Sequence, residues 1–188
     1  MRIQKTDALL IVDVQNTFCP GGSLPVADGD AVVAPINRIM PLFDGRVYAS
    51  QDWHPPDHCS FIAQGGIWPP HAIQGTGDAE LHPDLDHAAI SHIVRKGINA
   101  SRDAYSAFDG TDLASILRDA GIQRVFVTGL ATDYCVKASG TDAVSADFEV
   151  VAVTDAMRPV DVSPGDGDTA LAAMQSAGVA MVTSDALS

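Results

Sequence analysis

The hydrophobic positions of this chain form short runs that are typical of strands buried on both faces of a sheet. Six such runs are predicted to be strands, at residues 8–12, 47–50, 90–94, 124–127, 150–153 and 179–182. Four other segments have helical patterns or helix-end residues, at 30–43, 111–120, 132–146 and 168–177. Strands that alternate with helices favour a parallel sheet with helices on both faces. We therefore predict a three-layer α/β/α fold with a six-stranded, mostly parallel sheet.

Composition narrows the class of protein without changing this fold. The 188 residues are 46% hydrophobic and 19% charged, which suits one globular domain spanning residues 1–188. The net charge of −13 argues against nucleic acid or an anionic membrane as a partner, because an acidic surface repels both. No signal peptide or membrane-length apolar run is found, and three cysteines without CxxC spacing make no disulfide framework. We expect a cytoplasmic protein with a small-molecule substrate, either a monomer or a homo-oligomer.

Four consecutive predicted strands end in residues that are capable of chemistry. In chain order these residues are Asp13, Asp52 with His54, Lys96 and Cys135. The carboxyl ends of parallel strands lie along one edge of the sheet, which is where ligands bind in open α/β folds. By contrast, Asp155 and Asp185, at the ends of the last two strands, are interpreted as turn or cap residues. The sequence therefore predicts one site at the edge formed by the first four strands.

Cys135 is the candidate nucleophile of this site. It is placed in the first turn of a helix, where unpaired N–H groups and the positive end of the helix dipole favour a thiolate. The alternative is a small buried helix residue, since free cysteines are commonly buried. A cysteine hydrolase also needs a proton acceptor and donor, a role that Asp13 can take. Lys96, between the acid and the thiol, would stabilise the thiolate.

All six histidines lie between His54 and His92, and some of them have the spacing of metal ligands. Asp52 and His54 are two residues apart on an extended segment, so both side chains can face one side. His71 is the third candidate ligand, and two imidazoles with one carboxylate suit Zn²⁺, Fe²⁺ or Mn²⁺. The fourth position is open between His58, Ser60 and water. The remaining histidines are expected to be structural or exposed: His82, His87 and His92.

Six motifs follow one another along the chain: Asp13-Val-Gln-Asn-Thr-Phe18, Asp52-Trp-His54-Pro, Trp68-Pro-Pro-His71, Lys96-Gly97, Tyr105-Ser-Ala-Phe108 and Gly129-Leu-Ala-Thr-Asp-Tyr-Cys135-Val. In these motifs the chain resembles the nicotinamidase/pyrazinamidase group of the isochorismatase-like cysteine hydrolases, which implies their Rossmann-like fold. Cys135 argues against the isochorismatases proper, which lack this cysteine. Thr17 departs from the family's usual acidic residue, and we expect this to affect loop hydrogen bonding only.

The resemblance implies hydrolysis of nicotinamide to nicotinate and ammonia in NAD salvage, through a thioester on Cys135, with pyrazinamide as a further substrate. It implies the catalytic triad Asp13, Lys96 and Cys135. It also implies the metal ligands Asp52, His54 and His71. The metal, expected to be zinc with iron or manganese as alternatives, would bind the ring nitrogen of the substrate and not activate water.

The resemblance also implies how the substrate is held. The peptide bond between Leu130 and Ala131 is expected to be cis, and the N–H groups of Ala131 and Cys135 are expected to bind the oxyanion. Three aromatic residues would line a slot for the flat ring, with core packing as their alternative role: Phe18, Trp68 and Tyr105.

Two other functions remain open from the sequence. One is a related amidohydrolase that acts on a ureido or carbamoyl substrate, which has no ring nitrogen for the metal. The other is a non-catalytic binding protein on the same fold, in which Cys135 would be unreactive towards iodoacetamide at neutral pH.

Overall fold

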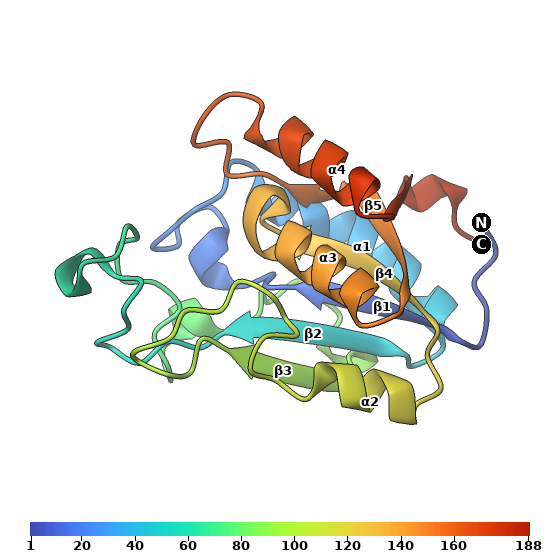
Figure 1. The fold of residues 1–188 in the computed structure, drawn as a ribbon, viewed down its shortest axis with the longest axis horizontal. Helices are drawn as coiled ribbons and strands as arrows, with labels where there is room; N and C mark the ends of the chain where they lie inside the picture. The colour runs from blue at the N-terminus through green and yellow to red at the C-terminus, as the bar shows by residue number, and fades with distance from the viewer.

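The computed structural model describes all 188 residues, and its centre is one six-stranded parallel sheet (Figure 1). The strands are β1 (Asp7–Val12), β2 (Val47–Asp52), β3 (His92–Lys96), β4 (Arg124–Leu130), β5 (Glu149–Arg158) and β6 (Ala180–Val182). Their order across the sheet is β3-β2-β1-β4-β5-β6, and every neighbouring pair is parallel. The predicted fold class is confirmed.

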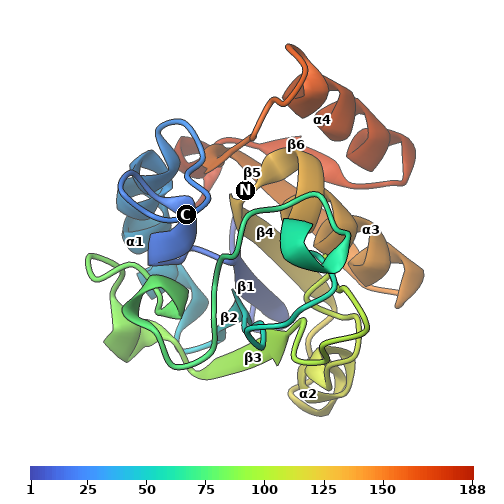
Figure 2. The same cartoon turned by 90° about the vertical axis from the view of Figure 1, so that its left-hand side faces the viewer.

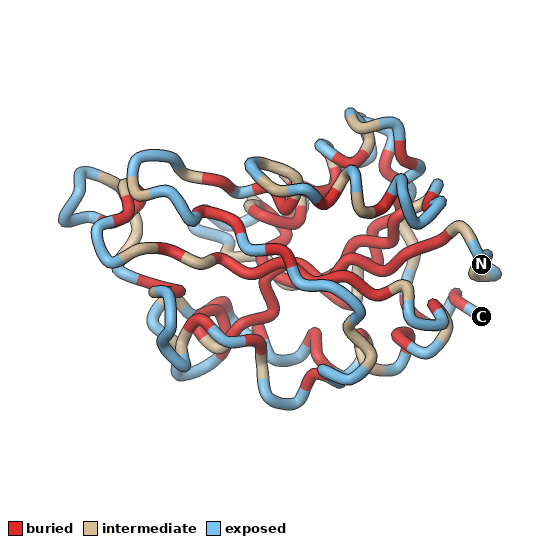
Figure 3. Tube along the Cα trace, turned by 90° about the horizontal axis from the view of Figure 1, so that it is seen from below, coloured by how far each residue is buried: buried red, intermediate tan, exposed pale blue.

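Helices cover both faces of the sheet (Figure 2). The helices are α1 (Val33–Ile39), α2 (Leu113–Asp119), α3 (Lys137–Ser145) and α4 (Asp166–Ser176). One face packs against α1 and its flanking 3-10 turns, and the other packs against α2, α3 and α4. Alternate residues of the central strands supply the two halves of the core; for example, Leu9 faces one side and Leu10 the other. The buried residues therefore follow the strands through the middle of the molecule (Figure 3).

Several element boundaries differ from the prediction. The third strand was predicted at 90–94 and lies at His92–Lys96, because its pairing with β2 runs on to the Asp52–Lys96 pair. The fifth strand does not end at Asp155 and continues to Arg158, after a shift of its register with β4. The helix predicted at 30–43 is a short α-helix between 3-10 turns, since Pro41 cannot donate a helical hydrogen bond.

The carboxyl ends of the strands lie at one end of the molecule, and the two termini lie at the other (Figure 1). Two long connections, residues 53–91 and 97–112, gather over the carboxyl ends of β2 and β3. None of the helices combines the length and the apolar character needed to span a bilayer.

Candidate active site

The parallel register brings four predicted site residues together at the carboxyl edge of the sheet. Asp13 directly follows β1, with a left-handed φ of 47° that turns the chain away from the sheet. Asp52 and Lys96 are the last residues of β2 and β3, and they are register partners. Cys135 follows β4. Since these four strands are neighbours in the sheet, residues far apart in sequence meet here as predicted.

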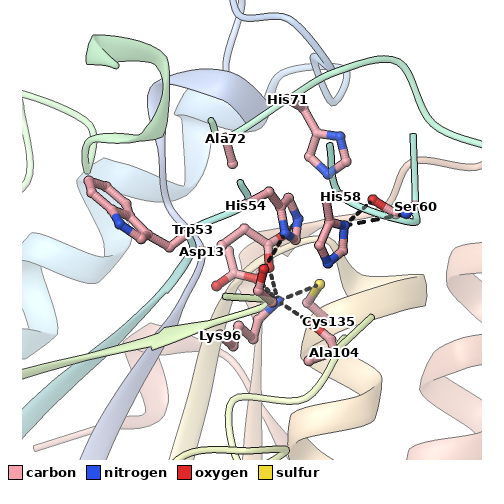
Figure 4. A network of polar contacts seen from close by, with 12 residues as sticks. Asp13, Trp53, His54, His58, Ser60, His71, Ala72, Lys96, Ala104 and Cys135 are labelled. Atoms are coloured by element: carbon pink, nitrogen blue, oxygen red, sulfur yellow. Dashed lines mark hydrogen bonds and ion pairs between the residues drawn. The ribbon is translucent and has the colours of Figure 1, made fainter. Parts of the chain in front are cut away.

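Lys96 contacts each of the other three residues of this cluster (Figure 4). Its buried Nζ lies 2.9 Å from Asp13 Oδ2 and 2.5 Å from Asp52 Oδ1. It also donates to the carbonyl oxygen of Ala104 at 3.1 Å and to Cys135 Sγ at 3.4 Å. Burial alone would lower the pKa of Lys96, but the two carboxylates outweigh it and hold that pKa well above its usual value. Lys96 is therefore a fixed positive charge between the acid and the thiol.

Asp13 is suited to accept a proton. Its side chain is fully buried, and its Oδ1 accepts a hydrogen bond from Ser50 Oγ at 2.6 Å. Its Oδ2 pairs with the Lys96 charge but accepts no well-aligned hydrogen bond, which leaves a lone pair free. Burial raises the pKa of Asp13 above its usual range, although the charge of Lys96 opposes this. A carboxylate with a raised pKa is a stronger base than an ordinary aspartate.

The local structure around Cys135 differs from the regular helix that the sequence predicts. It lies in a π-helical turn, Thr132–Val136, and the regular helix α3 begins only at Lys137. Burial raises the pKa of the Cys135 thiol well above its usual value, with the charge of Lys96 opposing. Burial beside the carboxylates of Asp13 and Asp52 therefore opposes the effect of the helix start on this thiol. A thiolate at this position needs the charge of Lys96 and a group that accepts its proton.

A second cluster lies beside the first and has the composition of a metal site. The ligand atoms of Asp52, His54 and His71 all lie within 4.8 Å of one another, and all three side chains are buried. His54 Nδ1 is 2.9 Å from the carbonyl oxygen of Gly97, and His71 Nδ1 is 2.8 Å from that of Pro69. These carbonyl oxygens fix Nδ1–H as the donor, so each Nε2 keeps its lone pair for a metal. The three residues therefore fit a divalent cation such as zinc.

The sequence left the fourth ligand open, and the structure engages both candidates in other contacts. His58 Nδ1 accepts from the main-chain N–H of Ser60 and contacts Ser60 Oγ at 2.7 Å. Its Nε2 is left to donate to the carbonyl oxygen of Arg102 at 3.2 Å, and its ring stacks on His54 at 4.0 Å. The other three histidines lie outside the site, as expected, and are exposed or half-buried: His82, His87 and His92.

An apolar pocket opens above Cys135. The three predicted aromatic residues line it together, and Trp68 Nε1 donates to Tyr105 Oη at 3.1 Å across its mouth. Five further lining residues were not predicted: Leu24, Pro25, Val26, Tyr134 and Val160. Tyr134 could have been suspected because it precedes the nucleophile. The other four come from loops whose sequence carries no signal of the pocket.

The peptide bond between Leu130 and Ala131 is cis, as expected. Ala131 lines the same pocket as Cys135, and its N–H donates to no other group of the protein. The main chain thus leaves a free donor beside the sulfur. Such a donor is what an oxyanion requires.

Comparison with known proteins agrees with this geometry. The family model described as the isochorismatase domain matches residues 7–186. This chain belongs to the isochorismatase family. Among its relatives in the family, the nicotinamidase of Escherichia coli (strain K12) is 40% identical, and the alignment covers 94% of each chain.

Two solved structures of relatives have the same fold. The pyrazinamidase of Pyrococcus horikoshii, solved in complex with zinc, has a TM-score of 0.88 and 41% identity, covering 95% of this chain and 99% of that chain. PnC1 from L. infantum, solved in complex with nicotinate, has a TM-score of 0.93 and 40% identity. The match covers 98% of this chain and 96% of that chain. The resemblance inferred from the motifs is confirmed at the level of the family and of these nicotinamidase and pyrazinamidase relatives.

Proposed function

We propose that this chain is a nicotinamidase, which hydrolyses nicotinamide to nicotinate and ammonia and also converts pyrazinamide to pyrazinoate. The strongest support is the buried contact of Lys96 with both Asp13 and Cys135, because Cys135 also lines an apolar pocket. The pocket suits a flat aromatic ring. The relatives of this chain include a nicotinamidase and a pyrazinamidase. The product nicotinate gives the enzyme a place in NAD salvage.

The reaction begins with proton transfer from Cys135 to Asp13. The thiolate, stabilised by Lys96, attacks the carboxamide carbon, and the resulting oxyanion accepts hydrogen bonds from the N–H groups of Ala131 and Cys135. The C–N bond then breaks as Asp13 returns its proton to the departing nitrogen, which leaves as ammonia. The products of this half-reaction are ammonia and a thioester on Cys135.

The same aspartate completes the cycle. Asp13 takes a proton from water, and the hydroxide attacks the thioester carbon. The C–S bond breaks, the acid product leaves, and Asp13 returns the proton to the sulfur of Cys135. Phe18, Trp68 and Tyr105 hold the ring throughout and limit access of other water to the thioester.

Asp52, His54 and His71 would hold a divalent metal, which we propose to be zinc. When bound, the metal would act as a Lewis acid towards the ring nitrogen of the substrate. The two imidazoles are already held in the tautomer that this role needs, by the carbonyl oxygens of Gly97 and Pro69.

Substrate profiling tests the proposal. Purified wild type should release ammonia from nicotinamide, and its kcat/KM for benzamide, which lacks the ring nitrogen, should be at least about a hundredfold lower. The measurement is coupled detection of ammonia with each amide. Release from a ureido or carbamoyl substrate and none from nicotinamide would show that the substrate assignment is wrong while the cysteine chemistry stands.

Replacement of a proposed ligand should remove metal and activity together. His54→Ala is expected to weaken zinc binding by more than about 100-fold. Loss of a residue that only hydrogen-bonds to a metal ligand typically weakens binding by roughly 10- to 100-fold, and this variant removes a ligand itself. Zinc content by elemental analysis and ammonia release should fall in parallel, while His87→Ala, at an exposed position outside the site, should change neither. Full activity of a zinc-free His54→Ala variant would exclude a role for the metal.

A further inference from the structure

Gln15 makes contacts that neither the proposed reaction nor the metal ligands account for. Its side chain is fully buried. Nε2 donates to the carbonyl oxygen of Asp52 at 2.9 Å, and Oε1 accepts from the main-chain N–H of Asp52 at 2.8 Å. Nε2 also donates to the carbonyl oxygen of Ala79 at 2.7 Å. One amide therefore satisfies both main-chain polar groups of Asp52, as a neighbouring strand would.

This contact replaces a strand partner that Asp52 lacks. The backbone pairing of β1 with β2 extends only to Ile11 and Ala49, because the chain turns away from the sheet at Asp13. On the opposite side, β3 holds the next residue, since Trp53 N donates to the carbonyl oxygen of Lys96 at 3.0 Å. Successive residues of a strand point their polar groups to opposite neighbours, so those of Asp52 face the vacated β1 side. Gln15 fills that position.

We propose that Gln15 is a positioning residue for the metal site, an inference that rests on the metal site of the proposed function. It holds the end of β2 so that the Asp52 carboxylate stays among His54 and His71. Without its amide, the N–H and C=O of Asp52 would be buried without partners, and the C=O of Ala79 would keep only the hydrogen bond from Gln51 Nε2. The end of β2 would then shift to recover hydrogen bonds, and the carboxylate would move with it.

Gln51 provides a matched control. It is also a buried glutamine, and its Nε2 donates to the same Ala79 carbonyl oxygen at 3.2 Å. Its Oε1 accepts from Arg95 Nε at 3.4 Å, and its side chain makes no hydrogen bond to Asp52. Loss of this amide removes a buried hydrogen-bonding group from the same region without releasing the ligand.

The test compares Gln15→Met with Gln51→Met, because methionine keeps the length and burial of the side chain without its hydrogen bonds. The Kd of each apoprotein for Zn²⁺ is measured by competition with a chromogenic chelator, and Tm is measured without metal. Gln15→Met should raise the Kd by about 10- to 100-fold, as is typical when a residue that orients a metal ligand is lost. Gln51→Met should keep the wild-type Kd even where its Tm falls.

Equal Kd values for wild type and Gln15→Met, or equal increases in the two variants, would overturn the proposal. If Gln15→Met does not fold, Gln15→Glu replaces it, since glutamate keeps the acceptor for Asp52 N–H but loses both donated bonds, and its Kd should also rise. A wild type that binds no zinc would refute the metal site and this role with it. A wild type that binds zinc but releases no ammonia from nicotinamide would refute only the substrate assignment, and the comparison of Kd values would still decide the role of Gln15.

Discussion

Cys135→Ala is expected to lower ammonia release from nicotinamide by at least about 10⁴-fold, because Cys135 is the one thiol that lines the pocket and the thioester forms on it. Alanine leaves Asp13, Lys96 and the metal ligands in place, so zinc content should stay at the wild-type level. Acid-quenched wild type should carry an acyl adduct that hydroxylamine removes, and the variant should carry none. Steady-state assays, elemental analysis and intact mass measure these three results.

The control for this experiment is Cys59→Ala. Cys59 is half-buried and free, and its side chain lies outside the pocket. This variant should keep activity close to that of wild type. Ammonia release by Cys135→Ala at a rate near that of Cys59→Ala would exclude covalent catalysis by Cys135.

Lys96→Met is expected to have the largest effect on stability. Removing the cation leaves the carboxylates of Asp13 and Asp52 buried without their shared partner, so one of them must take up a proton or admit water. Breaking a buried ion pair in this way costs about 3–5 kcal/mol of the free energy of unfolding. For a chain of this size that corresponds to a fall in Tm of roughly 6–20 °C. Activity should also be lost, since nothing then stabilises the thiolate of Cys135.

Lys5→Met separates this effect from the loss of any positive charge. Lys5 is exposed and makes no ion pair, so its replacement should change neither Tm nor kcat. Calorimetry and ammonia release on both variants give the comparison. If Lys96→Met unfolds at the same temperature as Lys5→Met, the buried pairs contribute nothing to stability.

The sequence predicted the framework of the site because that framework follows from chain topology. Apolar runs placed the strands, and parallel strands bring their carboxyl ends to one edge whatever their exact length. Asp13, Asp52 and Cys135 therefore meet at that edge although their strand boundaries were uncertain. Even the third strand, which lies two residues later than predicted, still ends at Lys96. The predicted site is insensitive to errors of one or two residues in a strand boundary, because each functional residue lies at or just after the end of its strand.

The chemical state of these residues was less accessible from the sequence. A cysteine at the start of a helix favours a thiolate, whereas burial beside the carboxylates of Asp13 and Asp52 raises the pKa of Cys135. The depth of burial depends on segments as distant as the loop that supplies Val160. No local pattern contains that information.

The sequence by itself determined the order of strands and helices along the chain. It also determined which residues with functional side chains follow the strands, and the spacing of Asp52 and His54. These depend on local periodicity and on the fixed alternation of strand and helix. Only the tertiary structure decided that His71 lies beside them, that His58 is held by Ser60, and that Gln15 binds the main chain of Asp52. Such contacts join segments through long loops, and their geometry is set by the packing of the whole fold and not by the residues near them in the chain.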